Sequence, residues 1–188
     1  MVKTRIGHPS KPGHAKRLVG PMRIPVVRPP KHSAAQAPAN AADLAGSIEP
    51  VNCQQPGASV GAPYQTLLQA VKLLEAGLPF AAIARLQAVS GLTLDRIKQV
   101  VRISEGSFAR RKQTGRLSQD ESERLLRIGR VFERATSLHD GDQSSARKWL
   151  ETPIPALANH RPLDLAQTEP GAREVEDLIG RIVYGVVS

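Results

Sequence analysis

The distribution of proline divides this chain of 188 residues into a part that can form long helices and a part that cannot. Ten of the fifteen prolines lie within the first 63 residues, and proline disfavours the interior of helices and strands. The same stretch carries eight lysines and arginines but only two acids, Asp43 and Glu49. Such a segment buries too little apolar surface to offset the entropy lost on ordering. We therefore predict that residues 1–61 form a disordered, basic N-terminal arm.

From Tyr64 onward, apolar side chains recur at the three- and four-residue spacing of amphipathic helices. The first predicted helix ends before Gly77 and carries these apolar residues on one face: Leu67, Leu68, Val71 and Leu74. Four more predicted helices follow, at residues 79–90, 93–101, 104–113 and 118–135, and Ser118 with Glu121 marks the start of the last one as a capping box. Aromatic residues make up only 3% of the chain, so the core must be built from aliphatic side chains, as in small helical units. We predict an all-α protein.

Residues 94–113 contain the pattern of a helix-turn-helix. Ile97, Val101, Ile103 and Phe108 fall where two short crossing helices would pack, and Ser104 would cap the second helix. This stretch resembles the helix-turn-helix of the Cro and phage-repressor class, whose second helix lies in the major groove of DNA. The net charge of +9 also indicates an acidic partner such as nucleic acid.

The resemblance implies which residues would contact DNA. The base-facing positions would be Ser104, Glu105, Gly106, Ala109 and Arg110, of which Arg110 alone is a strong donor to guanine. Phosphate contacts suit Arg111, Lys112 and Arg116, because such contacts position a protein without specifying sequence. The full candidate set consists of Ser104, Glu105, Ser107, Arg110, Arg111, Lys112 and Arg116.

Two residues depart from the helix-turn-helix pattern. Arg102 stands at the tight turn, where glycine normally adopts the left-handed conformation without steric cost. Lys98 stands where a small residue normally lies under the second helix. From the spacing alone, a helical bundle with a solvated basic face is the alternative interpretation.

The last third of the chain has the opposite charge balance. After a predicted hinge at residues 136–143, acidic residues outnumber basic ones, so the N-terminal part of the chain is basic and the C-terminal part is mildly acidic. Two different partners would explain this asymmetry, and the alternative is that it is incidental.

A series of short motifs in residues 146–188 carries a specific resemblance. They are Trp149-Leu150, Pro153 to Leu157, Pro162 to Leu165, Thr168 to Ala172, and Tyr184 to Val186. Together they resemble the toxin-binding domain of the Xre/MbcA/ParS antitoxins, and the preceding helix-turn-helix also suits that family. The resemblance covers residues 80–188.

The resemblance implies a partner and a mode of action. The partner would be a toxin with a RES domain, which degrades NAD, and the C-terminal region of the antitoxin would dock on the toxin and reach toward its active site. Tyr184, Val186 and Val187 at the end of the chain cannot all face inward on the one apolar side of the last helix. An exposed apolar end is typical of a surface that binds a partner. The candidate toxin contacts are Arg181, Tyr184, Gly185, Val186, Val187 and Ser188. The alternative is that this tail packs only on its own domain.

These observations lead to one hypothesis with one alternative. We expect an arm at residues 1–61, a helix-turn-helix domain at 62–136 and a small helical toxin-binding domain at 137–188. The protein would be a cytoplasmic antitoxin that occludes its toxin, represses its own operon by binding operator DNA, and forms a homodimer or a hetero-oligomer with the toxin. The alternative is a helix-turn-helix transcription regulator whose C-terminal domain serves only for dimerisation. No metal-ligand spacing, phosphate-binding loop or membrane span is present in the sequence, so we expect no enzyme activity, no metal, no cofactor and no membrane partner.

Overall fold

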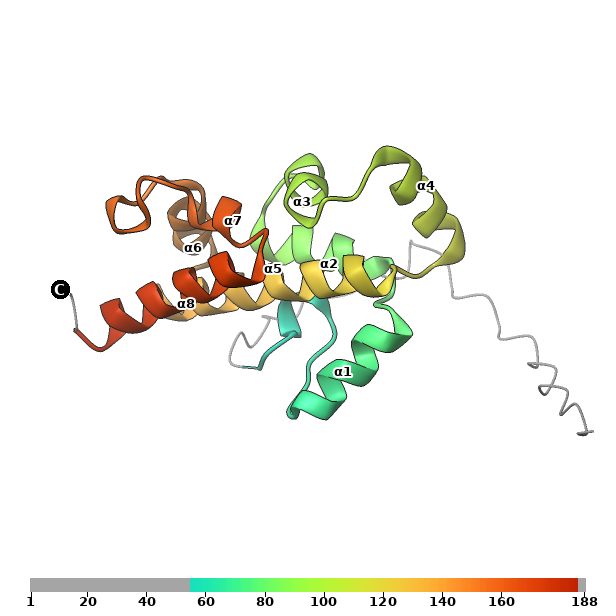
Figure 1. The fold of residues 1–188 in the computed structure, drawn as a ribbon, viewed down its shortest axis with the longest axis horizontal. Helices are drawn as coiled ribbons and strands as arrows, with labels where there is room; N and C mark the ends of the chain where they lie inside the picture. Colours follow the sequence, from blue (N-terminus) through green and yellow to red (C-terminus); the bar gives the residue numbers. More distant parts are fainter. Residues whose placement is uncertain (1–54, 186–188) are drawn as a thin grey trace, which may run out of the picture. The chain divides into compact units, whose positions relative to one another are not determined.

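Helices make up the regular structure of residues 55–185, the part of the chain that the computed structural model describes (Figure 1). Within these residues no strand is present, so the prediction of an all-α protein is confirmed. The elements are the 3-10 helix η2 (Ala58–Val60), α1 (Leu67–Ala76), α2 (Ala81–Ser90), α3 (Leu94–Val101), α4 (Glu105–Thr114), α5 (Gln119–Leu138), α6 (Gln143–Glu151), the 3-10 helix η3 (Pro155–Leu157), α7 (Pro162–Leu165) and α8 (Glu169–Val183).

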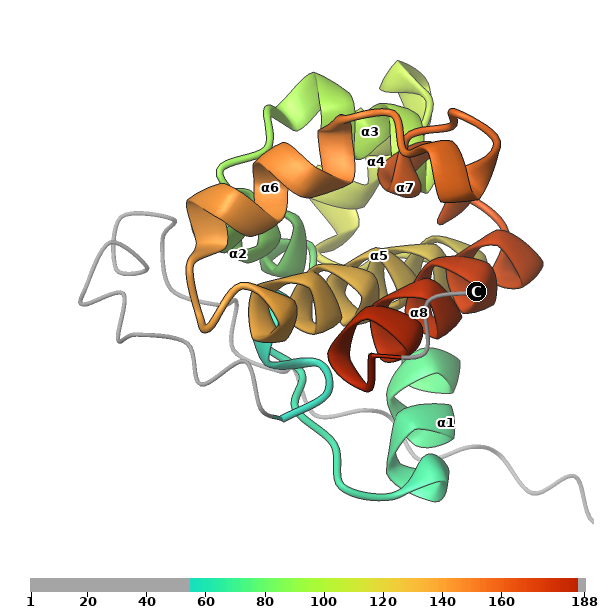
Figure 2. The same ribbon diagram turned by 90° about the vertical axis from the view of Figure 1, so that its left-hand side faces the viewer.

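The long helix α5 is the element around which the others pack. It begins at the predicted capping box of Ser118 and Glu121, and its apolar stripe from Leu125 to Phe132 is buried. Helices α1, α3, α6 and α8 all contact it, and Figures 1 and 2 both show α8 lying along it. Helix α5 continues to Leu138, so the predicted hinge is shorter than expected and is confined to residues 139–142.

The segment just before the first α-helix belongs to the folded core. Val60 is buried against α2 and α5, and Ser59 is completely buried. The Glu133 carboxylate of α5 accepts hydrogen bonds from the Ser59 amide at 2.8 Å, the Ser59 hydroxyl at 2.6 Å and the Gly57 amide at 3.1 Å. Gly129 faces this segment, and a Cβ there would lie 2.7 Å from the Ser59 hydroxyl oxygen. The prediction of a disordered arm is therefore wrong for residues 55–61, while residues 1–54 lie outside the described part.

Helix α1 forms where expected, but three of the four residues of its predicted apolar stripe point to solvent. The side chains of Leu67, Leu68 and Val71 are 81%, 64% and 40% exposed. The helix contacts α5, and its inward side carries the buried Ala70 with Leu73 and Leu74, which are partly buried against the core. The packed face is therefore turned away from the predicted stripe and shares only Leu74 with it.

The C-terminal helices pack on the same core as the helices before them. Thr168 caps α8, and Ala172, Val175 and Ile179 of that helix are buried. Ile182, one turn further along the same face, is exposed, so the buried face of α8 ends at Ile179. The division into domains at residues 136 and 137 stays a prediction, since α5 spans that point and packs against both sides.

Candidate functional site

Helices α3 and α4 meet in the tight turn that the helix-turn-helix pattern requires. Arg102 occupies the turn with φ 59° and ψ 48°, the left-handed conformation expected of the residue at this place. The Ile103 amide then donates to the Lys98 carbonyl at 2.9 Å, which closes the turn. Ser104 caps α4 by accepting a hydrogen bond from the Ser107 amide at 3.2 Å. The steric cost of a left-handed arginine is therefore present in the fold.

Helix α4 stands away from the core, with no buried residue of its own. Its main apolar contact is Phe108, whose ring meets that of Phe80 edge-on with 5.0 Å between centroids. Figure 1 shows the helix projecting beyond α2 and α5. A projecting helix with an open polar face has the form that insertion into a DNA groove requires.

The predicted DNA-binding residues differ in whether the fold already uses their side chains. Arg110 and Lys112 are exposed and form no ion pair within residues 55–185. Ser104 caps the helix by accepting from the Ser107 amide, and Glu105 accepts a hydrogen bond from Lys98. Arg110 and Lys112 can therefore meet a phosphate or a base edge without breaking an ion pair within the described residues.

Arg111 and Arg116, by contrast, hold the fold together. The Arg111 guanidinium donates to the Glu121 carboxylate at 2.7 Å, and Arg116 donates to the carbonyls of Ala76 and Gly77 at 3.1 and 2.8 Å. Burial alone would raise the pKa of Glu121, but the hydrogen bonds from Ser118 and Arg111 outweigh it and hold the pKa below its ordinary value. The sequence placed both arginines in a basic cluster, and only the structure shows that they join α4 and its flank to α5 and α1.

The C-terminal end of α8 is the second candidate site. Ile182, Val183 and Tyr184 are 40%, 57% and 83% exposed, so apolar surface gathers at the end of this helix. Arg181 pairs with Glu174 at 3.0 Å, and Gly185 has a φ of 68°. Val186, Val187 and Ser188 lie outside the described residues. An exposed tyrosine beside exposed aliphatic side chains is typical of a protein-binding surface.

The two candidate sites lie far apart in the fold. In Figure 1, α4 lies at the right and the C-terminal end of α8 at the left. In Figure 2, α4 lies behind the other helices while the end of α8 faces the viewer. The two surfaces therefore do not overlap.

Long-range contacts that sequence reasoning missed connect the C-terminal helices to the helix-turn-helix. Arg96 of α3 donates to the Asp164 carboxylate of α7 at 2.6 Å, and Arg147 of α6 donates to the Gly91 carbonyl at 3.0 Å. Each pair is separated by more than fifty residues. Polar residues of this kind carry no periodic signal, so the sequence alone could not pair them.

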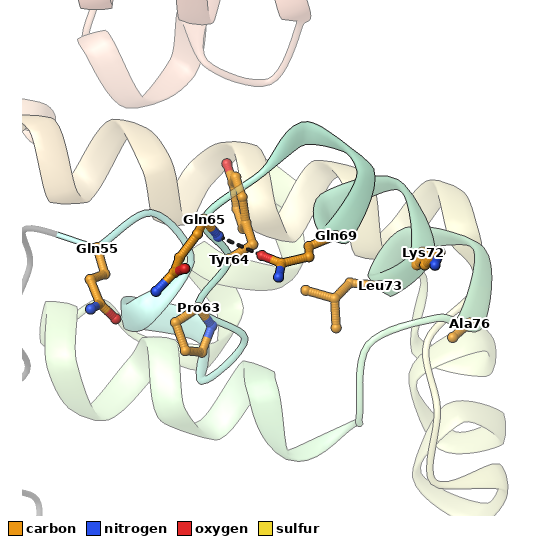
Figure 3. A pocket seen from close by; sticks show the side chains of 8 residues that line it. All are labelled: Gln55, Pro63, Tyr64, Gln65, Gln69, Lys72, Leu73 and Ala76. Atoms are coloured by element: carbon orange, nitrogen blue, oxygen red, sulfur yellow. Dashed lines mark hydrogen bonds between the residues drawn. The ribbon is translucent and has the colours of Figure 1, made fainter.

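A cavity of about 550 Å³ lies between α1 and the segment before it (Figure 3). Tyr64 and Leu73 line it, and the Gln69 side chain accepts from the Gln65 amide at 2.8 Å across its edge. None of the predicted site residues lies in it. Among residues 55–185, no group of histidine, cysteine and acidic side chains is placed to hold a metal, and no helix has the length and apolar character of a membrane span.

Comparisons with known proteins match both candidate regions. The model of the "Antitoxin Xre-like helix-turn-helix domain" matches residues 69–130, and that of the "Antitoxin Xre/MbcA/ParS C-terminal toxin-binding domain" matches residues 134–185. A protein from Photorhabdus laumondii named "Antitoxin Xre" is 34% identical over 131 residues, which are 69% of this chain and 88% of that protein. A protein of the same name from Yersinia enterocolitica is 39% identical over 115 residues, which are 61% of this chain and 69% of that protein.

Proposed function

This chain belongs to the Xre family of antitoxins, and on that basis we propose that it neutralises a RES-domain toxin by covering the active site with which the toxin degrades NAD. Family membership supports the coarser statement directly: the protein is an antitoxin of a toxin–antitoxin system, with a helix-turn-helix domain and a domain for a cognate toxin. The RES domain, the loss of NAD and the occlusion are the parts that we propose.

The observation that carries the proposal is the exposed apolar end of α8. The helix is capped by Thr168 and held on α5, so its last turn is presented on a preformed support. Tyr184 offers a large, flat contact with few rotatable bonds, and its hydroxyl can hydrogen-bond inside a polar cleft. An antitoxin that acts in this way blocks its partner by occupancy, so we propose that it has no catalytic activity and uses no cofactor.

We propose that the same protein represses its own operon. The exposed Arg110 and Lys112 on the projecting helix α4 support this role. Since α4 and the end of α8 do not overlap, the bound toxin would leave the DNA-binding helix uncovered. Both roles place the protein in the cytoplasm, where DNA and NAD are found.

We further propose that the chain acts as a homodimer or as a hetero-oligomer with its toxin. Helix-turn-helix proteins usually bind two half-sites as symmetric dimers, and Arg110 is the one strong base-recognising residue among the candidates on α4. The exposed Leu67, Leu68 and Val71 of α1 add apolar surface that the single chain leaves uncovered.

The alternative function is a transcription regulator whose C-terminal domain only dimerises. Co-expression with the protein encoded by the adjacent gene separates the two. A toxin partner that co-purifies, and whose NAD-degrading activity disappears in the complex, supports the antitoxin mechanism. A self-associating protein that retains no neighbour-encoded partner supports the alternative.

A further inference from the structure

Helix α4 has no fully buried side chain: Phe108 packs only partly buried against the core, and the Arg111–Glu121 pair joins its last turn to α5. Most of the stability of a short helix in a protein comes from burying an apolar face, and ten residues are too few for a stable isolated helix. These two contacts lie in the middle and at the end of α4, and no residue of its first turn, Glu105 to Ser107, is buried. Contacts other than core packing must therefore fix the direction of this first turn.

The Lys98 side chain occupies the space between α3 and α4. Its ammonium group lies 2.6 Å from the Glu105 carboxylate at the start of α4 and 2.9 Å from the Asp95 carboxylate of α3. The same ammonium lies 5.4 Å from the centre of the Phe108 ring, within the range of a cation–π contact. Only 13% of the lysine side chain is exposed. One lysine thus contacts both helices and the aromatic anchor of α4.

We propose that Lys98 is a positioning residue for DNA recognition, which fixes the direction of α4 by bridging Asp95, Glu105 and the Phe108 ring. This inference rests on the proposed DNA-binding role of α4. It also explains the departure from the helix-turn-helix pattern, since a lysine takes the place of the small residue and supplies polar contacts where the usual fold buries apolar surface.

Each contact of Lys98 is modest by itself. Asp95 and Glu105 are largely exposed, and a single exposed ion pair contributes little to stability. Three contacts that meet at one ammonium act together, however, and the lysine stem packs between the helices. The hydrogen bond that Lys98 donates to Glu105, and then the one that it donates to Asp95, raise the pKa of Lys98, so the ammonium stays charged at neutral pH.

The bridge also sets the charge that α4 presents. Glu105 lies in the first turn of α4, the end that enters the groove in the helix-turn-helix class. Unpaired, its carboxylate would repel the phosphates, and Lys98 neutralises it. Positioning and neutralisation therefore have to be separated by experiment.

The test uses the full chain, with Lys98→Met keeping most of the stem and removing the charge. We expect operator affinity to fall roughly fivefold, the low end of what one well-placed base contact contributes. The slope of affinity against salt should stay unchanged, because a lysine bound to two carboxylates releases no counterion from DNA. A slope smaller by about 0.9 would show a direct phosphate contact instead and would overturn the proposal. Lys148→Met, a change of an exposed lysine on α6, is the matched control.

A double-mutant cycle separates positioning from neutralisation. If the bridge positions α4, Glu105→Gln should also weaken binding, and the double variant should bind no more weakly than Lys98→Met alone. If Lys98 only neutralises charge, Glu105→Gln should bind as tightly as the wild type or more tightly, and the double variant should recover full affinity. Lys98→Arg, which can rebuild the two ion pairs, should restore much of the loss.

Amide hydrogen exchange tests the bridge without DNA. Residues 105–114 should exchange faster in Lys98→Met while residues 119–138 stay protected, because α5 is held by the core. Unchanged exchange in α4 would overturn the positioning role. A wild-type protein with no preference for its promoter would instead overturn the proposed repression, and the exchange result would still stand.

Discussion

Arg127 of α5 and Glu169 of α8 form an ion pair of 2.8 Å that joins the two helices at the start of α8. Arg127 is nearly buried, and it also donates to the Glu123 carboxylate at 2.6 Å and to the Gln167 carbonyl at 3.1 Å. Glu169 lies in the first turn of α8, where a negative charge meets the positive end of the helix dipole. The helix that carries the proposed toxin-binding tail is therefore fixed before any toxin arrives.

Arg127→Ala should lower the free energy of unfolding by about 2 kcal/mol, because the Gln167 carbonyl and the Glu123 carboxylate lose their donor and Glu169 keeps only its longer contacts with Arg130 and Arg173. Urea unfolding followed by circular dichroism measures this change. Arg134→Ala, at an exposed position of the same helix, is the control and should leave the midpoint unchanged. Equal midpoints for the two variants would show that the network contributes nothing to stability.

The pH dependence of stability should reflect the same pair. Burial alone would raise the pKa of Glu169, but the hydrogen bond from Arg127 and the charge of Arg130 outweigh it and hold the pKa below the ordinary 4.5. A lowered folded-state pKa stabilises the protein fully above about pH 4.5, and this contribution disappears as the pH falls through the lowered value. Glu169→Gln should therefore make the loss of stability in acid less steep than in the wild type. The exposed Glu151→Gln, with no ion pair within residues 55–185, should leave the acid profile unchanged.

Local signals allowed the helices to be predicted, whereas the faces that they bury could not be. The capping box at Ser118 and the N-cap at Ser104 depend only on neighbours in the sequence, and both are present as predicted. Helix α1 shows the limit, because its exposed stripe has the same periodicity as a buried one. Tertiary contacts decide which side of the helix packs on the protein, and they bury Ala70 and partly bury Leu73 and Leu74.

The sequence allowed the locations of the candidate sites to be predicted, but not the contacts that their side chains make. Arg110 and Arg111 are neighbours in one basic run, yet one is exposed and the other is paired with Glu121. In the sequence, Lys98 is only a departure from the helix-turn-helix pattern. Its contacts with Asp95 and Glu105 could not be predicted, since spacing alone does not show which carboxylates surround a lysine. The end of the arm was misplaced because Ser59 and Val60 follow prolines and glycine, and their burial depends on the distant Glu133.

Two truncations should separate the charge of the N-terminal residues from the fold. Deleting residues 1–54 removes eight lysines and arginines, so affinity for every DNA sequence should fall alike and the salt slope should flatten. Deleting residues 1–60 should in addition lower the free energy of unfolding by about 2–3 kcal/mol, because Glu133 would lose its donors and Val60 its burial. Thermal unfolding of both variants beside the full chain makes the comparison. Equal stability of the two truncations would contradict the packing of Ser59 and Val60.

Arg110→Ala should relax the discrimination between operator and random DNA by roughly 1–3 kcal/mol if Arg110 contacts guanine. Lys112→Ala should weaken binding to operator DNA and to random DNA equally, because a phosphate contact does not depend on the base sequence. Arg111→Ala should behave differently from either and destabilise the protein, since it leaves the buried Glu121 without its partner. Binding titrations at two salt concentrations, with unfolding curves for each variant, test all three. Loss of stability in Arg110→Ala would show that its side chain is structural.

Removal of Tyr184 to Ser188 should leave the fold intact and abolish protection from the toxin. The last buried residue of α8 is Ile179, and Tyr184 is largely exposed, so stability should not change. A tyrosine anchored in a partner contributes roughly 2–4 kcal/mol, or about 30- to 1000-fold in affinity. Co-expressed with its toxin, the truncated protein should accumulate in soluble form while cellular NAD falls and growth stops. Tyr184→Ala should give a weaker form of the same defect.

The substitution Val187→Asp sharpens this test, because it changes the charge of the tail without shortening it. An unpaired carboxylate inside the contact with the toxin should weaken binding strongly, whereas the same change in a solvated tail should have no effect. A pull-down beside the growth and NAD measurements separates lost binding from lost protein. If the truncated antitoxin still binds tightly and protects fully, the toxin must dock on the surface around residues 149–165, and the exposed end of α8 serves only to close its own helix.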